Sequence, residues 1–68
     1  MQGWFKLCIA KNYIEANIIK GKLEKNSILA IILNRQDSNY QTFGEIELYV
    51  PAYLKDIAIH LLDNTLLN

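Results

Sequence analysis

The small size of the chain constrains its fold most, because the sequence offers neither a disulfide nor a metal site to stabilise it. It has 68 residues, with one cysteine, Cys8, and one histidine, His60. One cysteine excludes an internal disulfide, and one Cys with one His cannot fill a tetrahedral zinc site. Domains below roughly 70–80 residues often depend on such links or on a partner chain. We therefore expect one domain, residues 1–68, held by its apolar core or by self-association.

Composition and charge narrow the class of protein. Apolar residues make up 51% of the chain and charged residues 21%, which is typical of a globular protein. The net formal charge is zero, which argues against nucleic acid as the main partner. The charge is uneven: residues 1–34 carry five Lys and two Glu (+3), and the rest carry two basic and five acidic side chains (−3). Such polarity can favour the pairing of copies, although small surfaces often carry it without a function.

The N-terminal stretch MQGWFKLCIA does not have the pattern of a signal peptide, because its apolar run is short and is broken by Lys6. No window approaches the roughly 18 apolar residues of a membrane span, so no membrane partner is expected. A lone free thiol without an export signal fits the cytoplasm. We therefore expect a cytoplasmic protein.

The first half of the chain predicts a strand followed by a helix. Residues 4–10 alternate as a half-buried strand does. Asn12 and Glu15 form a capping-box pair ahead of a helix that runs to about Lys25, and Asn26 is expected to end it in the left-handed conformation. One strand face is predicted to carry Phe5, Leu7 and Ile9, and the other Trp4, Lys6, Cys8 and Ala10.

The second half predicts two strands and a helix. Residues 28–33, ILAIIL, are predicted to form a short strand that is apolar on both faces. Residues 45–50 alternate strictly, and Pro51 stops that strand ahead of a helix over about 52–63, closed by Asn64. The core stripe of this helix is predicted to contain Leu54, Ile57, Ala58, Leu61 and Leu62.

The predicted order is thus β-α-β-β-α. The first helix should connect two parallel strands by a right-handed crossover. The compact solution is an α+β, two-layer sandwich with both helices on one face of a small sheet. In a ferredoxin-like half-fold the strand order is 1-3-2, the third strand is central, and the first strand has an open edge.

The motifs NYIEA, KGKLE, GEIELYVP and DIAIHLL span most of the chain, from about residue 5 to 63. Together they resemble a family of small, uncharacterised bacterial domains that are described as prokaryotic signal-transducing proteins. The resemblance implies a ferredoxin-like half-fold distantly similar to the PII nitrogen-regulatory proteins, with no catalytic residues to carry over. Ser27 departs from the family, which tends to have Gly before the second strand, and this leaves the geometry of that turn open. The matching positions are Glu15, Ala16, Gly21, Leu23, Glu24, Val50, Pro51, Ala58, Leu61 and Leu62.

The first helix is apolar on two sides and has a glycine, Gly21, in its interior. Glycine there costs about 1 kcal/mol relative to alanine. The second helix could fill the space above Gly21, the side could face another subunit, or it could be an exposed patch. The sheet side is predicted to consist of Ala16, Ile19 and Leu23, and the other side of Ile14, Ile18 and Gly21.

The sheet face without helices is predicted to be apolar and to form an interface. A sheet edge or face of this kind invites pairing with a second chain. We expect a homodimer or higher oligomer, formed through this face or by pairing first-strand edges. The predicted interface residues are Trp4, Cys8, Ile28, Ile32 and Tyr49, with Ala30 on the same face.

The sequence has few groups arranged for chemistry. Cys8 could act as a nucleophile only with a base such as His60, and nothing in the pattern brings the two together. No glycine-rich phosphate loop and no zinc spacing is present, so we expect no enzyme, cofactor or metal. Weaker candidates are Glu45 and Glu47 for acid/base chemistry or a cation, and Lys20, Lys22 and Lys25 for phosphate.

The loop over residues 34–44 is predicted to meet a partner, through Arg35, Tyr40 and Phe43. In the PII proteins the corresponding connection is the signalling loop and bears a modifiable tyrosine. The leading hypothesis is a non-enzymatic signal-transducing, regulatory or protein-interaction module that acts as a homo-oligomer with an unknown protein or small-molecule partner. The alternative is a PII-like regulator that binds a small molecule or nucleotide.

Overall fold

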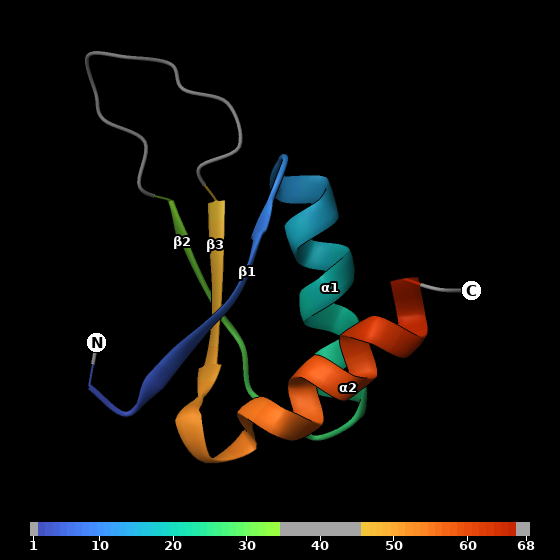
Figure 1. The fold of residues 1–68 in the computed structure, drawn as a ribbon. Helices are drawn as coiled ribbons and strands as arrows, with labels where there is room; N and C mark the ends of the chain where they lie inside the picture. Colours follow the sequence, from blue (N-terminus) through green and yellow to red (C-terminus); the bar gives the residue numbers. More distant parts are fainter. Residues whose placement is uncertain (1, 35–45, 67–68) are drawn as a thin grey trace.

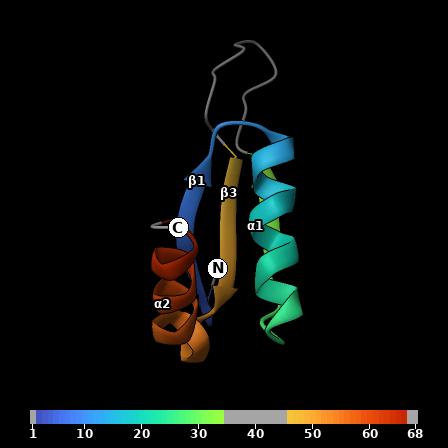
Figure 2. The same ribbon diagram turned by 90° about the vertical axis from the view of Figure 1, so that its right-hand side faces the viewer.

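A three-stranded antiparallel sheet and two helices make up this α+β fold (Figure 1). The structure is a computed structural model that describes residues 2–34 and 46–66. The sheet order is β1-β3-β2, so β3 is central, as expected, and the outer strands run parallel to each other. Both helices lie on one face of the sheet (Figures 1 and 2). The elements are β1 (Trp4–Ala10), α1 (Tyr13–Lys25), β2 (Ile31–Asn34), β3 (Ile46–Pro51), a 3-10 turn η1 (Ala52–Leu54) and α2 (Lys55–Leu66).

Helix α1 begins at the predicted cap, with one change in its hydrogen bonds. The Asn12 side-chain oxygen accepts a bond from the Glu15 N–H at 2.8 Å. The Glu15 carboxylate accepts from the Lys11 N–H at 3.1 Å, one residue before the position that a capping box uses. Two otherwise unsatisfied backbone donors at the helix start are therefore bonded by side chains.

The end of α1 corrects the prediction for Asn26. Its φ is −103°, whereas Ser27 has the left-handed φ of 64°. The Ile28 N–H donates to the Leu23 carbonyl at 2.9 Å, and the Ser27 N–H donates to the Glu24 carbonyl at 3.0 Å. These two bonds define a Schellman motif, in which the left-handed residue is the first one after the cap. Ser27 therefore occupies the conformation that glycine adopts most easily.

The sheet side of α1 is the predicted one, whereas α2 differs from its prediction. Ala16 and Leu23 are fully buried, and Ile19 packs beside them. On α2, Ala58 is fully buried, but Ile57 is 58% exposed and does not belong to the core. Successive helical residues are about 100° apart, so the neighbour of a central core residue points sideways. The helix also continues past Asn64 to Leu66.

A β-bulge in β1 overturns the predicted faces of that strand. Lys6 pairs with Tyr49 and Cys8 pairs with Leu48, so Leu7 is an extra residue in the ladder. An extra residue reverses the alternation of the side chains that follow it. Cys8 therefore lies on the helix side, against the core cluster that contains Leu48. We had expected it on the uncovered face.

The same reversal exchanges Ala10 and Ile9. Ala10 is fully buried on the helix side, whereas Ile9 pairs with Glu47 and is 53% exposed. Both were predicted on the opposite faces. Alternation alone could not reveal the extra residue, because Leu7 and Cys8 are apolar neighbours and both contact the core.

The second strand was also assigned to the wrong faces. Ile32 pairs with Leu48 and packs on the helix-side core, and Ile28 is buried there at the end of the turn after α1. Ile31 and Leu33 point to the other face, because they pair with Tyr49 and Glu47. A run that is apolar at every position carries no periodicity from which to choose a face.

The second side of α1 is open in this chain. An added Cβ on Gly21 would meet no atom within 4 Å among the described residues. No described side chain of α2 fills the space above Gly21, contrary to that interpretation. Ile14 is 74% exposed and Ile18 is 54% exposed. Two interpretations of this side of α1 are left: a contact with another subunit, or an exposed patch.

We expect Ser27→Gly to raise the free energy of unfolding by about 0.5–1 kcal/mol, because glycine adopts a left-handed φ without steric strain. Asn26→Gly is the matched control. It removes the bond from the Asn26 side-chain amide to the Lys22 carbonyl (2.9 Å) at a residue that is not left-handed. This control should lower stability. Urea denaturation measures both, and a Ser27→Gly variant less stable than the parent would contradict the Schellman assignment.

Candidate functional site

The uncovered side of the sheet is the first candidate surface, and we call it the open face. The register places alternate side chains of all three strands on it, while both helices lie on the other side (Figures 1 and 2). Most of these side chains are only partly buried or are exposed. The open face consists of Trp4, Lys6, Ile9, Ile31, Leu33, Glu47 and Tyr49.

A buried carboxylate lies at the centre of the open face. Glu47 is only 5% exposed, because Ile9 and Leu33 flank it on the neighbouring strands. The Tyr49 hydroxyl donates to one Glu47 oxygen at 2.9 Å, and the Lys6 ammonium lies 3.4 Å from the other. A buried charge is tolerable only when it is paired and hydrogen-bonded, as it is here. The network fixes three polar side chains among apolar ones.

The five predicted interface residues do not lie on one face of the sheet. Trp4 and Tyr49 lie on the open face, whereas Cys8, Ile28 and Ile32 lie on the helix-covered side. The sequence analysis missed three apolar members of the open face, Ile9, Ile31 and Leu33. The last two could have been found by pairing the second strand with the clear alternation of β3.

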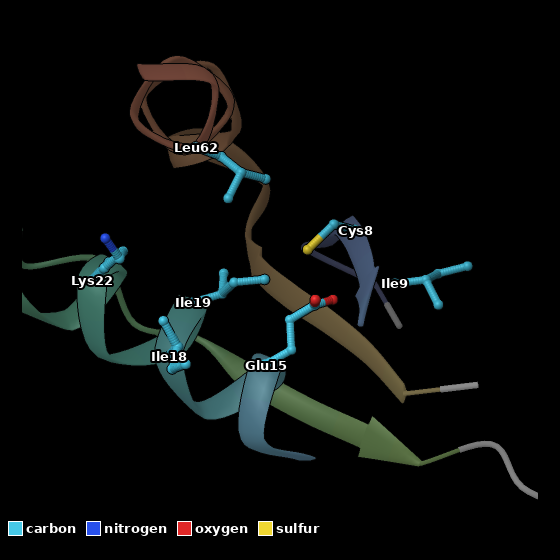
Figure 3. Close-up of a pocket in the computed structure, with 7 residues that line it drawn as sticks. All are labelled: Cys8, Ile9, Glu15, Ile18, Ile19, Lys22 and Leu62. Carbon is cyan, nitrogen blue, oxygen red and sulfur yellow. The ribbon is translucent and has the colours of Figure 1, made fainter. Parts of the chain in front are cut away.

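A groove between α1, α2 and β1 is the second candidate surface. Its volume is ≈ 390 Å³. Figure 3 shows the Cys8 sulfur, Ile19 and Leu62 pointing into it from three different elements, while Ile9 points away. Glu15 and Lys22 provide its charges. The lining residues are Cys8, Ile9, Glu15, Ile18, Ile19, Lys22 and Leu62.

The thiol in this groove is held in its protonated form. Burial of the side chain raises the pKa of Cys8, and the Glu15 carboxylate raises it further. A reactive cysteine needs the reverse, a thiolate stabilised by positive charge. His60 is exposed on α2 and does not line the groove. The arrangement therefore suits binding rather than nucleophilic chemistry.

The remaining candidates are dispersed. Lys20 forms an ion pair with Glu24 on the same helix (4.0 Å), and Lys25 is exposed in the last turn of α1. Glu45 and the predicted partner residues Arg35, Tyr40 and Phe43 lie outside the described residues. Within residues 2–34 and 46–66, no three His, Cys, Asp or Glu side chains gather as metal ligands. No helix in the same ranges has the length and apolar character to cross a membrane.

We expect iodoacetamide at pH 8 to alkylate Cys8 more slowly in the folded chain than in urea, because burial and the Glu15 carboxylate raise the pKa of the folded thiol. Glu15→Gln should speed the folded reaction by removing the second cause of the raised pKa. The unfolded chain loses the thiol proton at a lower pH than the folded chain, so stability should fall as the pH rises through the unfolded-state pKa. Equal alkylation rates in the folded chain and in urea would contradict the raised pKa of Cys8.

Comparisons of the chain with protein-family models, with curated proteins and with solved structures found no match. The described residues and the motifs of the sequence are therefore what indicates a function. Among these, the open face and the groove are the surfaces on which a function can be built.

Proposed function

We propose that the protein is a non-enzymatic regulatory or interaction module that acts as a homo-oligomer through the open face. The observation that supports this proposal most is an apolar sheet surface that no described helix covers, with a fixed polar network at its centre. Apolar patches of this kind usually mark protein interfaces. For so short a chain, an interface can also supply stability that the small core lacks.

The gain from covering the open face depends on the apolar area that a partner buries. Burying about 300–400 Å² of apolar surface per chain contributes on the order of 8–10 kcal/mol at about 25 cal/mol per Å². Lost translational and rotational freedom offsets a large part of this gain. The Glu47 network adds little net energy, since its groups are already satisfied within the chain. Its contribution would be specificity, because a partner must accommodate polar groups at one fixed place.

Face-to-face assembly is favoured over pairing of the β1 edges. The bulge at Leu7 interrupts the regular hydrogen-bond pattern of that edge strand. Bulges and charged residues such as Lys6 are the features that protect sheet edges from adding another strand. Among the described residues, no bulge interrupts the pairing of β2 with β3 at Ile31 and Leu33 on the open face.

A signal-transducing role in the cytoplasm is the finer part of the proposal. It is supported by the resemblance of the motifs to bacterial signal-transducing domains, and by the strand order β1-β3-β2, which is that of a ferredoxin-like half-fold. Contact of a partner with Arg35, Tyr40 and Phe43 stays a prediction from the sequence.

The PII-like alternative, binding of a small molecule or nucleotide, is supported by the groove. Lys22 in the groove would offer an anionic ligand a positive charge, and the groove volume of ≈ 390 Å³ would offer it room. The Glu15 carboxylate in the same groove opposes a phosphate, and Lys20 is paired with Glu24. Electrostatics therefore favour the interaction module over the anion-binding regulator.

We expect light scattering after size exclusion to give a mass above 7.9 kDa for the parent at micromolar concentration. Ile31→Lys should weaken association by at least about tenfold, because it puts a charge into the apolar contact. Ile31 lies on the open face and does not line the groove. Ile57→Lys is the matched control on exposed α2 and should leave the mass unchanged. A monomeric parent, or equal effects of both variants, would remove the proposal.

We expect no thermal shift with inorganic phosphate or ATP. A ligand at 100 times its dissociation constant stabilises the folded state by about 2.7 kcal/mol, which is several degrees for a small domain. Differential scanning fluorimetry at millimolar ligand measures this shift. An increase that Lys22→Met abolishes would favour the PII-like alternative instead.

A further inference from the structure

The α1 wall of the groove is complementary to itself. The four α1 residues that line it are Glu15, Ile18, Ile19 and Lys22. Reversing the direction of the helix about the midpoint between Ile18 and Ile19 exchanges Glu15 with Lys22 and one isoleucine with the other. The two charges are seven residues apart, or about 10.5 Å along the axis at 1.5 Å per residue. An antiparallel copy of the same helix would therefore meet opposite charge at both ends and apolar side chains in the middle, where the exposed Ile18 offers more surface than Ile19, which packs on the core.

We infer that the occupant of this surface is a second copy of the chain, with the two α1 helices packed antiparallel about a two-fold axis. Each Glu15 would then lie opposite Lys22 of the second copy, so the pair occurs twice. Neither residue forms an ion pair within the described chain, where the pairs are Lys6–Glu47 and Lys20–Glu24. A free ion in the groove would be attracted by one of these two side chains and repelled by the other. A reversed copy of the helix would place only opposite charges against them.

The second side of α1 extends the same surface. Ile14 and Ile18 are largely exposed, and the site of a Gly21 Cβ is open space. In the antiparallel arrangement, Ile14 comes within one helical turn of Gly21 of the second copy. A position without a side chain lets another helix approach closely, which gives a reason for a glycine that is unfavourable in a helix interior. Nothing within the described residues supplies another reason for this glycine.

This contact is separate from the open face and goes beyond the proposed function. A single helix seam buries less than the roughly 800 Å² per partner of a standard interface, so it should be weak alone. A chain with two two-fold contacts, one on each layer, can join dimers into tetramers or longer arrays. The groove is then an assembly contact, and its opposite charges set the direction of the helices.

Charge reversal and mixing test the inference. Sedimentation velocity should show that Lys22→Glu weakens self-association about tenfold, because two attractive pairs become two repulsions. Lys25→Glu makes the same change on α1 outside the groove and should have less than about a twofold effect. Mixing Lys22→Glu with Glu15→Lys should restore association, since each variant then meets opposite charge at both ends. High salt should weaken the contact in the parent.

Each outcome decides the inference. Equal effects of Lys22→Glu and Lys25→Glu, or a mixture that associates no better than either variant alone, would overturn it. Glu15→Lys also removes the bond to the Lys11 N–H, so circular dichroism must show that it folds. If it does not fold, the comparison of the two lysine variants decides alone. Repeating these measurements in the Ile31→Lys background separates this contact from the open face, because each can then fail independently.

Discussion

The bulge at Leu7 is the constraint on which the rest of the structure depends. It turns Cys8 and Ala10 under α1, where Ala10 and Ala16 are both fully buried. Two small side chains in one core cluster let the helix approach the sheet closely at that end. A regular strand would place Ile9 there instead, and a large side chain would push the helix away. The bulge therefore sets the height of α1 above the sheet, and it delivers the Cys8 sulfur to the floor of the groove.

The same bulge shapes the opposite face. By sending Ile9 outward, it completes the apolar wall beside Glu47 that Leu33 forms on the other strand. The carboxylate becomes buried without any helix above it, and Lys6 and Tyr49 must then satisfy it. A polar network of this kind adds little stability, but it gives a flat apolar surface a fixed register. One inserted residue thus determines the inner core and the outer surface together.

The sequence predicted those features that local chemistry determines. The Asn12 cap, the end of α1 near Lys25 and its sheet side all depend on residues close in sequence. The left-handed conformation was predicted at Asn26 and occurs at Ser27, because asparagine is the commoner left-handed residue after glycine. The bulge and the faces of β2 depend on pairing between distant strands, which apolar runs do not encode. The open face was therefore predicted as a feature, but three of the five residues assigned to it lie on the helix side of the sheet.

The two apolar sides of α1 follow from the size of the chain. A larger domain would cover both sides with its own elements. Here η1 and α2 reach the core through Leu54, Ala58 and Leu61, and the described residues leave Ile14 exposed. The interior glycine lowers the stability of an isolated chain, and the exposed isoleucines contribute no burial energy to it. Such features are compatible with a folded protein when another copy supplies the missing contacts. In the proposed assembly, these exposed features of the single chain would form the contacts between copies.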